Sequence, residues 1–207
     1  TFFKTPFEVI DIPNPNNSAY TAAALRNHLD LPYYEIAPGY QFLHCLINNA
    51  SGGESVAVDG FKVANYMKEK YTQYFETLLE TPVKFVNRDY TSNAIRVMHK
   101  PLFSLDHNND FNDIRFSVAY MGVMDCDPDQ MDKFYEAYRK LIALLHDPMF
   151  EINFRLKAGD IFSFNNRRVL HGRKEYDASS GERHLQGYYI DRDEIIGRLN
   201  YLNNLNP

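Results

Sequence analysis

The chain has 207 residues, of which 44% are hydrophobic and 24% charged, and this composition is typical of a globular protein rather than a disordered or fibrous one. The formal net charge of −5 argues against a protein that binds nucleic-acid phosphates, which would need clustered Lys and Arg. No apolar run approaches the roughly 20 residues that cross a bilayer, so we expect a soluble protein without a membrane partner. The length suits one domain that spans residues 1–207.

Cysteine usage indicates a reducing compartment. Cys45 and Cys126 form neither a C-x-x-C motif nor a framework of disulfides. Two N-x-S triplets, at Asn16 and Asn49, are weak evidence for secretion because such triplets arise often by chance. We therefore expect a cytoplasmic protein.

The first clear element is a helix over residues 59–81, where apolar residues recur near helical spacing. Asp59 is its expected N-terminal cap and Pro82 its stop, and the pattern also allows a break into two helices. Strands are predicted next, because β-branched and aromatic residues alternate with polar ones over residues 82–90, 93–103 and 113–122.

A second helix is predicted from Pro128 to His146, with Asp127 as its cap. Its apolar stripe is expected to lie in the core and consists of Met131, Phe134, Tyr138, Leu141 and Leu145.

The last part of the chain returns to β signals. Residues 151–166 are predicted to form a strand, an Ala-Gly-Asp turn and a second strand, and residues 183–190 a further strand. A short helix is expected to start at Asp191, with Glu194 completing a capping box. Many short strands with a helix laid over them, and no alternation of strand and helix, predict a mainly β fold with helical insertions, closed or double-layered.

One apparent metal motif is rejected. The stretch from Asp106 to Ser117 imitates an EF-hand loop, but Phe111 stands where the turn needs Gly, and Ser117 where a bidentate Glu should close the site. Three further histidines have no partner at ligand spacing and are expected on the surface or at a helix cap: His99, His107 and His146.

The residues that suggest chemistry are His28 and Asp30, an H-x-D pair, and His171, which follows an apolar strand late in the chain. An H-x-D pair alone arises often by chance. Two histidines and one carboxylate are, however, the facial triad of non-heme Fe(II) oxygenases, which leaves metal positions open for a cosubstrate and dioxygen. Side chains two apart on a strand share a face, so His28 and Asp30 are expected to point the same way, with His171 on a strand alongside.

Arg183 is the candidate that would bind the far carboxylate of a 2-oxo acid, because a planar guanidinium can donate two hydrogen bonds to it. Ser55 would add a hydroxyl donor. Arg173, two residues after His171, is the competing cation. His44 lies on a predicted buried strand and is expected to be a hydrogen-bonded core histidine rather than a metal ligand.

Four segments carry a family resemblance: "AYTAAALRNHLDLPYYEIAPGYQFLHC", "SGGESVAVDGF", "LKAGDIFSFNNRRVLHGRKEY" and "RHLQGYYIDRDEI". Together they resemble the γ-butyrobetaine dioxygenase and trimethyllysine dioxygenase branch of the taurine-dioxygenase-like, 2-oxoglutarate-dependent oxygenases. The resemblance covers nearly the whole chain.

The resemblance implies a double-stranded β-helix (jelly roll), Fe(II) on His28, Asp30 and His171, and 2-oxoglutarate bound through Arg183 and Ser55. It further implies a dioxygenase that uses O2, converts 2-oxoglutarate to succinate and CO2, and hydroxylates a small molecule. Animal relatives carry a zinc-binding domain, but the cysteines for one are missing here, so zinc is not predicted.

The resemblance also implies a substrate pocket. Phe7, Tyr20 and Tyr189 align with an aromatic cage for a trimethylammonium group, as does Phe3, and Asn17 aligns with an amide that meets the substrate carboxylate.

Several positions of this pocket depart from the butyrobetaine enzymes. Phe7 stands where those enzymes place a tryptophan, and the sequence contains no Trp at all. Leu31 stands where they can have Tyr, and Ser117 and Val118 replace a pair of asparagines. A pocket with fewer donors should bind a carboxylate less tightly.

Three functions therefore stay open. The first is hydroxylation of γ-butyrobetaine or a related quaternary amine, as in carnitine biosynthesis. The second is the same oxygenase chemistry on another small molecule, such as an amino acid, sulfonate or phosphonate. The third is a jelly-roll binding protein without turnover, against which all three ligands and Arg183 argue. A homodimer is also expected.

Overall fold

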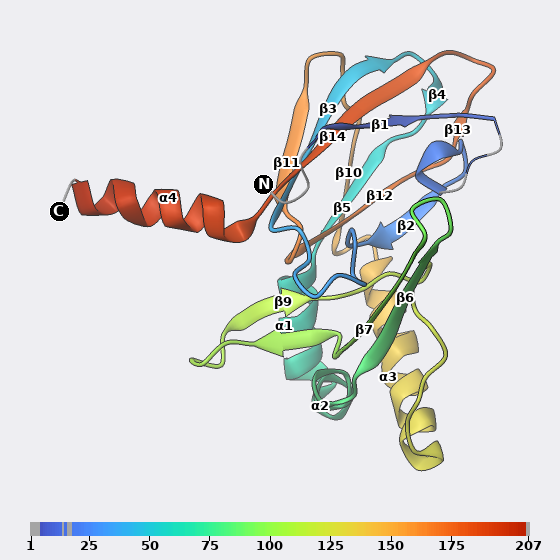
Figure 1. Ribbon diagram of the computed structural model, residues 1–207. Helices are drawn as coiled ribbons and strands as arrows, with labels where there is room; N and C mark the ends of the chain where they lie inside the picture. The colour runs from blue at the N-terminus through green and yellow to red at the C-terminus, as the bar shows by residue number, and fades with distance from the viewer. Residues whose placement is uncertain (1–4, 14, 16–17, 206–207) are drawn as a thin grey trace.

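The computed structural model describes residues 5–13, 15 and 18–205, and its centre is a pair of four-stranded antiparallel sheets (Figure 1). The first sheet has the order β1 (Phe7–Ile10), β14 (Arg183–Ile190), β3 (Tyr40–Asn48) and β11 (Ile161–Asn165). The second has the order β10 (Glu151–Phe154), β5 (Ser55–Asp59), β12 (Val169–Arg173) and β2 (Leu25–His28). The predicted double-stranded β-helix is confirmed.

Three two-stranded ribbons complete the strands. They pair β4 (Ser51–Gly52) with β13 (Tyr176–Asp177), β6 (Val83–Asp89) with β7 (Ala94–Lys100), and β8 (Phe103–Leu105) with β9 (Phe111–Ile114). The helices are η1 (Ser18–Tyr20), α1 (Gly60–Lys70), α2 (Thr72–Glu80), α3 (Pro128–Leu145) and α4 (Arg192–Leu205).

The helix predicted over residues 59–81 is two helices, as its pattern allowed. The Asp59 side chain accepts hydrogen bonds from the backbone N–H groups of Phe61 and Lys62 and so caps α1. The break falls at Tyr71, whose φ of −142° and ψ of 52° are not helical. Pro82 follows the end of α2, as predicted.

The second predicted helix, α3, begins and ends as expected. Asp127 caps it by accepting from the N–H of Asp129, and His146 is its C-terminal cap residue. Four members of its predicted stripe are buried and Met131 is half-buried, so the stripe does face the core.

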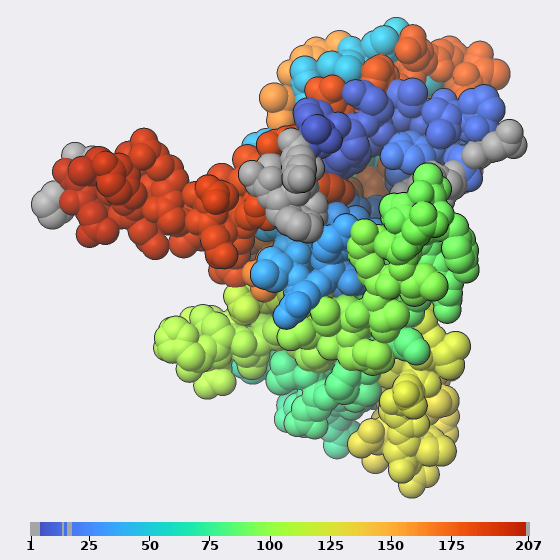
Figure 2. Space-filling model, viewed as in Figure 1, coloured from blue at the N-terminus to red at the C-terminus, as the bar shows by residue number. Residues whose placement is uncertain are grey.

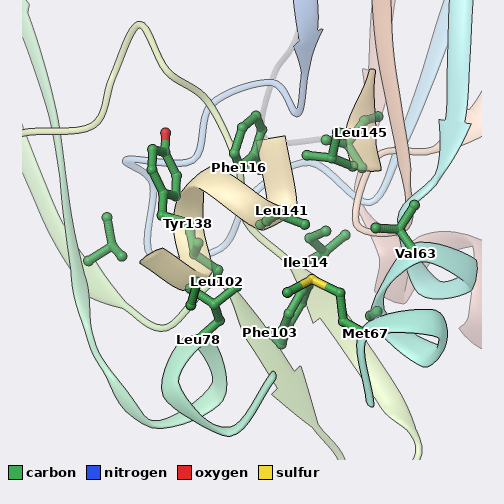
Figure 3. Close-up of a cluster of buried hydrophobic side chains, with 14 of the residues drawn as sticks. Val63, Met67, Leu78, Leu102, Phe103, Ile114, Phe116, Tyr138, Leu141 and Leu145 are labelled. Atoms are coloured by element: carbon green, nitrogen blue, oxygen red, sulfur yellow. The ribbon is translucent and has the colours of Figure 1, made fainter. Parts of the chain in front are cut away.

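The largest hydrophobic cluster lies on one side of the second sheet, between that sheet and the helices. Val58 of β5 and Leu170 of β12 join side chains from α1, α2 and α3 there. Figure 3 shows Val63 and Met67 of α1 near Leu141 and other α3 residues in this cluster. Because neighbours on a strand face opposite ways, residues next to Leu170 point away from this core.

One strand prediction needs correction. Residues 113–122 form a strand only as far as Ile114, at the end of β9. The chain then turns, with the N–H groups of Tyr120 and Met121 donating to the carbonyl of Ser117. The buried Arg115 donates to backbone carbonyls of residues 32–35, outside any sheet. The two strands predicted within residues 151–166 are confirmed, and they belong to different sheets: β10 joins β5 and β11 joins β3.

The C-terminal helix, α4, begins at Arg192, one residue after the expected start, and it projects from the body of the molecule (Figures 1 and 2). It has no buried residue, and Leu199, Leu202 and Leu205 are exposed on it. Among the described helices, none has both the length and the apolar character needed to cross a membrane.

Candidate metal centre

His28, Asp30 and His171 converge at one point between the sheets. His28 and His171 are directly paired in the register of β2 and β12, and their ring centroids lie 4.4 Å apart. His28 Nε2 lies 3.4 Å from Asp30 Oδ1, and His171 Nε2 lies 3.8 Å from Asp30 Oδ2. One ligand atom from each residue lies within 4.8 Å of the others, and within the described ranges this is the one His, Cys, Asp and Glu group able to hold a metal ion.

The local chain path explains why Asp30 reaches the two histidines. The strand ends at His28 rather than continuing through Asp30 as predicted. Leu29 is buried in the large core, and Leu31 adopts a left-handed backbone with φ of 55°, which is costly for a residue with a side chain. Asn166 fixes the bend from the other side: its Oδ1 accepts from the Asp30 N–H at 3.0 Å, and its Nδ2 donates to the Asp30 carbonyl at 3.1 Å.

Electrostatics favour the charged carboxylate. Burial acts to raise the pKa of Asp30, but the neighbouring His171, His28 and Tyr189 outweigh burial and hold the pKa well below its usual range. The Tyr189 hydroxyl donates to Asp30 Oδ2 at 2.5 Å. Burial lowers the pKa of His171 to about 3, which keeps this imidazole neutral. Burial acts to lower the pKa of His28, but Asp30 outweighs burial and raises it. A carboxylate and neutral imidazoles are the forms that bind a metal, so a metal bound here would displace the proton of His28.

The donor set fits a divalent transition metal. His28 Nδ1 lies 2.8 Å from the backbone carbonyl of Arg26, an arrangement that fixes the ring and leaves Nε2 directed at Asp30. The Nδ1 of His171 is buried and has no hydrogen-bond partner among the described residues. Two nitrogens and one carboxylate on one side of a metal leave its other positions open.

A cluster of buried guanidinium groups lies beyond His171 along β12. Arg173 and Arg183 both stack on the Tyr176 ring, at 4.9 and 5.7 Å from guanidinium carbon to ring centroid. Ser55 is buried and pairs with Arg173 across β5 and β12. Gly53, two residues before Ser55, lies close to Arg183: a Cβ placed on Gly53 would be 3.3 Å from the Cδ of Arg183.

The two arginines differ in what they bind. Arg173 donates to the carbonyls of Thr21 and Ala23, each at 2.6 Å, and so is committed to the backbone before β2. Among the described residues, the buried Nε of Arg183 has no hydrogen-bond partner, and burial together with Arg173 lowers the pKa of Arg183 to about 10. In the described part of the chain neither forms an ion pair, so an anion from outside would neutralise this cluster.

A pocket of about 520 Å³ opens in front of His28 and Asp30. Phe7, Tyr20 and Tyr189 line it together, and the Phe7 and Tyr189 rings stack with centroids 5.0 Å apart. The three expected cage aromatics in the described residues are therefore neighbours of one cavity. Phe3 and Asn17 lie outside the described residues.

The remaining histidines lie where they were expected or close to it. His99 and His107 are exposed, and His146 is the C-terminal cap residue of α3. His44 is half-buried on β3 rather than fully buried, and it is no part of the metal group. Asp106 accepts hydrogen bonds from the N–H groups of its own turn, between β8 and β9.

Sequence reasoning missed the residues that support the site. Asn166 fixes the Asp30 backbone, and Arg115 donates to the carbonyls of Pro32, Tyr34 and Glu35 in the loop that follows. Their partners lie 80 to 136 residues away along the chain. Residue spacing in the sequence carries no signal for such contacts. The polar character of Asn166, beside a strand that leads to His171, was the one available hint.

Comparison with known proteins gives a consistent result. The model of the family described as "Taurine catabolism dioxygenase TauD, TfdA family" matches residues 5–189. A γ-butyrobetaine dioxygenase from Pseudomonas sp. (strain AK-1) is 40% identical over 95% of this chain and 51% of its own length. The γ-butyrobetaine dioxygenase of Homo sapiens is 34% identical over 98% of this chain and 53% of its own length. The chain thus spans about half the length of these relatives.

Among solved structures, an asparagine oxygenase in complex with Fe(II), 2S,3S-3-hydroxyasparagine and succinate superimposes with a TM-score of 0.70. The match covers 89% of this chain and 56% of that one, at 18% sequence identity. At this identity the likeness concerns the fold, which is the jelly roll described above.

Proposed function

We propose, because the chain belongs to the TauD, TfdA family of dioxygenases, that it is an Fe(II)- and 2-oxoglutarate-dependent dioxygenase that hydroxylates a small molecule. The observation that carries the proposal is the convergence of His28, Asp30 and His171, whose ligand atoms lie within 4.8 Å of one another. These three side chains would hold Fe(II). When bound there, Fe(II) with 2-oxoglutarate and O2 supplies the oxidising chemistry for an unactivated C–H bond.

Arg183 and Ser55 are the proposed partners of the 2-oxoglutarate C5 carboxylate. The cationic cluster begins at Arg173, two residues from His171, a separation of about 7 Å along a strand. That distance suits a five-carbon diacid with its oxo-acid end at the metal and its far carboxylate at the cluster. Arg183 is favoured over Arg173, whose guanidinium already donates to two backbone carbonyls.

The substrate we favour is γ-butyrobetaine or a related quaternary amine. Phe7, Tyr20 and Tyr189 would receive the trimethylammonium group on their faces, where cation–π attraction contributes about 0.5–2 kcal/mol for a good contact. The names of the relatives support this choice. Asn17 would assist at the carboxylate.

A second substrate class has its own support in the pocket. Ser117 and Val118 also line the pocket, so this part of its wall offers one hydroxyl and one apolar side chain. Such a wall also suits an amino acid, a sulfonate or a phosphonate. The family likeness and the three converging ligands argue against a binding protein without turnover.

We further propose a cytoplasmic protein that forms a homodimer and works as one domain over residues 1–207. The reducing location is supported by two free cysteines, Cys45 and Cys126. Light scattering of the purified chain tests the dimer directly: a mass twice that of the 24.1 kDa chain is expected.

The experiment that tests the function is a substrate panel. The chain is supplied with Fe(II), 2-oxoglutarate and O2, and succinate release is measured with γ-butyrobetaine, trimethyllysine, an amino acid, a sulfonate and a phosphonate. Release stimulated by the quaternary amines supports the favoured substrate, and release stimulated by another compound identifies the second class. No release with any compound by a chain that binds Fe(II) and 2-oxoglutarate favours a binding protein.

A further inference from the structure

Arg26 lies on the same face of β2 as His28. Asn27 is buried and donates through its Nδ2 to the Leu145 carbonyl at the end of α3. Arg26, which is exposed, and His28, which is half-buried, are two residues apart on the strand and so share the opposite face. Both line the pocket in front of the metal triad. Arg26 is exposed, so its side chain lies outside the core, next to the pocket.

Arg26 is the one arginine or lysine among the described residues that line this pocket. Its backbone carbonyl meets His28 Nδ1, but within the described chain its guanidinium makes no hydrogen bond or ion pair. The other lining residue with a full charge is Asp30, which is already engaged by Tyr189 and the two histidines. A planar cation with all its donors available is an anion receptor.

The geometry sets the size of the ligand. Arg26 lies two residues, or about 7 Å along the strand, from His28. A molecule with its reacting carbon at the metal triad would place an anionic group against Arg26 if only a few bonds separate the two. The aromatic group of Phe7, Tyr20 and Tyr189 remains for the other end of the molecule.

We propose that Arg26 is a specificity-determining residue that binds the anionic end of the substrate, so that the pocket selects a short zwitterion with its cationic end on the aromatic rings. The inference rests on the proposed function and names its substrate class more closely. It assigns to Arg26 a role that Ser117 and Val118 cannot fill, since these lining residues bring no positive charge.

The test compares two probes that differ in one charge: γ-butyrobetaine and its primary amide. Binding of each is measured by calorimetry without O2, in the presence of Fe(II) and 2-oxoglutarate, for the wild type, Arg26→Gln and Arg26→Lys. Arg139→Gln, which removes an exposed arginine from α3, is the matched control. Binding of Fe(II) and of 2-oxoglutarate is measured for every variant.

Arg26→Gln is expected to weaken γ-butyrobetaine about 10- to 100-fold and to leave the amide nearly unchanged, because only the acid loses a charged partner. Arg26→Lys should recover part of the loss, since it restores the charge without the planar fork. The control should bind both probes like the wild type, and the variants should bind Fe(II) normally because the Arg26 carbonyl that meets His28 is retained.

Equal weakening of both probes would overturn the inference, because it would indicate packing rather than charge recognition. So would weaker binding of 2-oxoglutarate to Arg26→Gln, which would assign the guanidinium to the cosubstrate. If the wild type binds Fe(II) and 2-oxoglutarate but neither probe, the proposed zwitterionic substrate is excluded and the oxygenase function is unaffected. A wild type that binds neither Fe(II) nor 2-oxoglutarate would remove the proposed function and this inference with it.

Discussion

At the scale of single residues, the carboxylate of Asp30 is the most closely supported group in the site. Its backbone is fixed on both sides by Asn166, and its Oδ2 accepts from the Tyr189 hydroxyl. Groups that hydrogen-bond a metal ligand orient it and tune its affinity, and their loss commonly costs 10- to 100-fold, or about 1.4–2.8 kcal/mol. Tyr189 would thus serve the proposed metal site as well as the proposed substrate pocket.

We expect Tyr189→Phe to weaken Fe(II) binding about 10-fold, because the ring stays on Phe7 while the hydrogen bond to Asp30 is lost. Titration with Fe(II) without O2 measures the change. Tyr188→Phe, on the neighbouring strand position, is the control and should bind Fe(II) like the wild type. Unchanged affinity in Tyr189→Phe would contradict a supporting role for the hydroxyl.

Phe7 tests the aromatic cage. Phe7→Trp should tighten γ-butyrobetaine, because an indole face attracts a cation more strongly, and Phe7→Leu should weaken it by about 1 kcal/mol. The matched control ligand is 5,5-dimethylhexanoate, in which a carbon replaces the charged nitrogen. Its affinity should follow pocket volume alone. Equal affinities of the three proteins for γ-butyrobetaine would exclude the cage.

The sequence was sufficient to identify the three candidate metal ligands. It was not sufficient to identify the residues that hold them in place. Residue types and order singled out His28, Asp30 and His171, and their convergence is confirmed; their binding of a metal stays a prediction. The contacts of Asn166 and Arg115 were not predictable from the sequence. Arg115 donates to the carbonyl of Glu35, 80 residues away, and Asn166 accepts from the N–H of Asp30, 136 residues away.

At the scale of elements, Asp59 links the sheet to the helical layer. It ends β5, caps α1 and pairs with Arg168, whose Nη2 lies 2.7 Å from its Oδ2. Burial acts to raise the pKa of Asp59, but hydrogen bonds from Arg168 and from the first turn of α1 outweigh burial and lower the pKa. The carboxylate therefore stabilises the folded state.

Asp59→Ala should lower the free energy of unfolding by about 1 kcal/mol or more, because the cap is lost, and Asp59→Asn should lower it less, because the amide oxygen still accepts from the helix. Since the pKa of Asp59 is lower in the folded state, its charge contributes stability above the unfolded pKa near 3.8, and the contribution is lost as the pH falls through the folded pKa. The free energies of unfolding of the wild type and Asp59→Asn, measured with urea, should therefore differ at pH 7 and become equal in acid. A difference that does not change with pH would contradict the charge effect.

Helices whose sequence signals come from residues close together in the chain were predicted correctly. The caps Asp59 and Asp127 and the apolar stripe of α3 depend on neighbours within a few turns, and all are confirmed. The strand over residues 113–122 was wrong beyond Ile114, where Arg115 is buried against distant carbonyls. Alternation of apolar residues cannot reveal a tertiary contact of this kind.

At the scale of the whole molecule, the two ends of the proposed 2-oxoglutarate site come from different sheets. His171 lies on β12 in the second sheet, and Arg183 lies on β14 in the first. Both side chains are buried, and most of the apolar core lies on the far side of the second sheet. The space between the sheets thus holds these polar side chains together with a smaller apolar cluster around Cys45, Leu156 and Leu185.

Arg183→Leu should abolish 2-oxoglutarate binding and leave Fe(II) affinity nearly unchanged, because the guanidinium would meet the cosubstrate and not the metal. Arg139→Leu is the control on the exposed face of α3. Calorimetry with each ligand separates the two effects. If Arg183→Leu still binds 2-oxoglutarate normally, Arg173 must be the carboxylate partner.

We propose that His28, Asp30 and His171 bind Fe(II) and leave coordination positions free, so that 2-oxoglutarate can chelate the metal. The most direct measurement is the visible charge-transfer absorption that forms when a 2-oxo acid chelates Fe(II), recorded without O2 as 2-oxoglutarate is added. We predict that the band forms with the wild type and is lost both in His171→Ala and in Arg183→Leu. A wild type that shows no band, or an equally strong band in His171→Ala, would contradict the account.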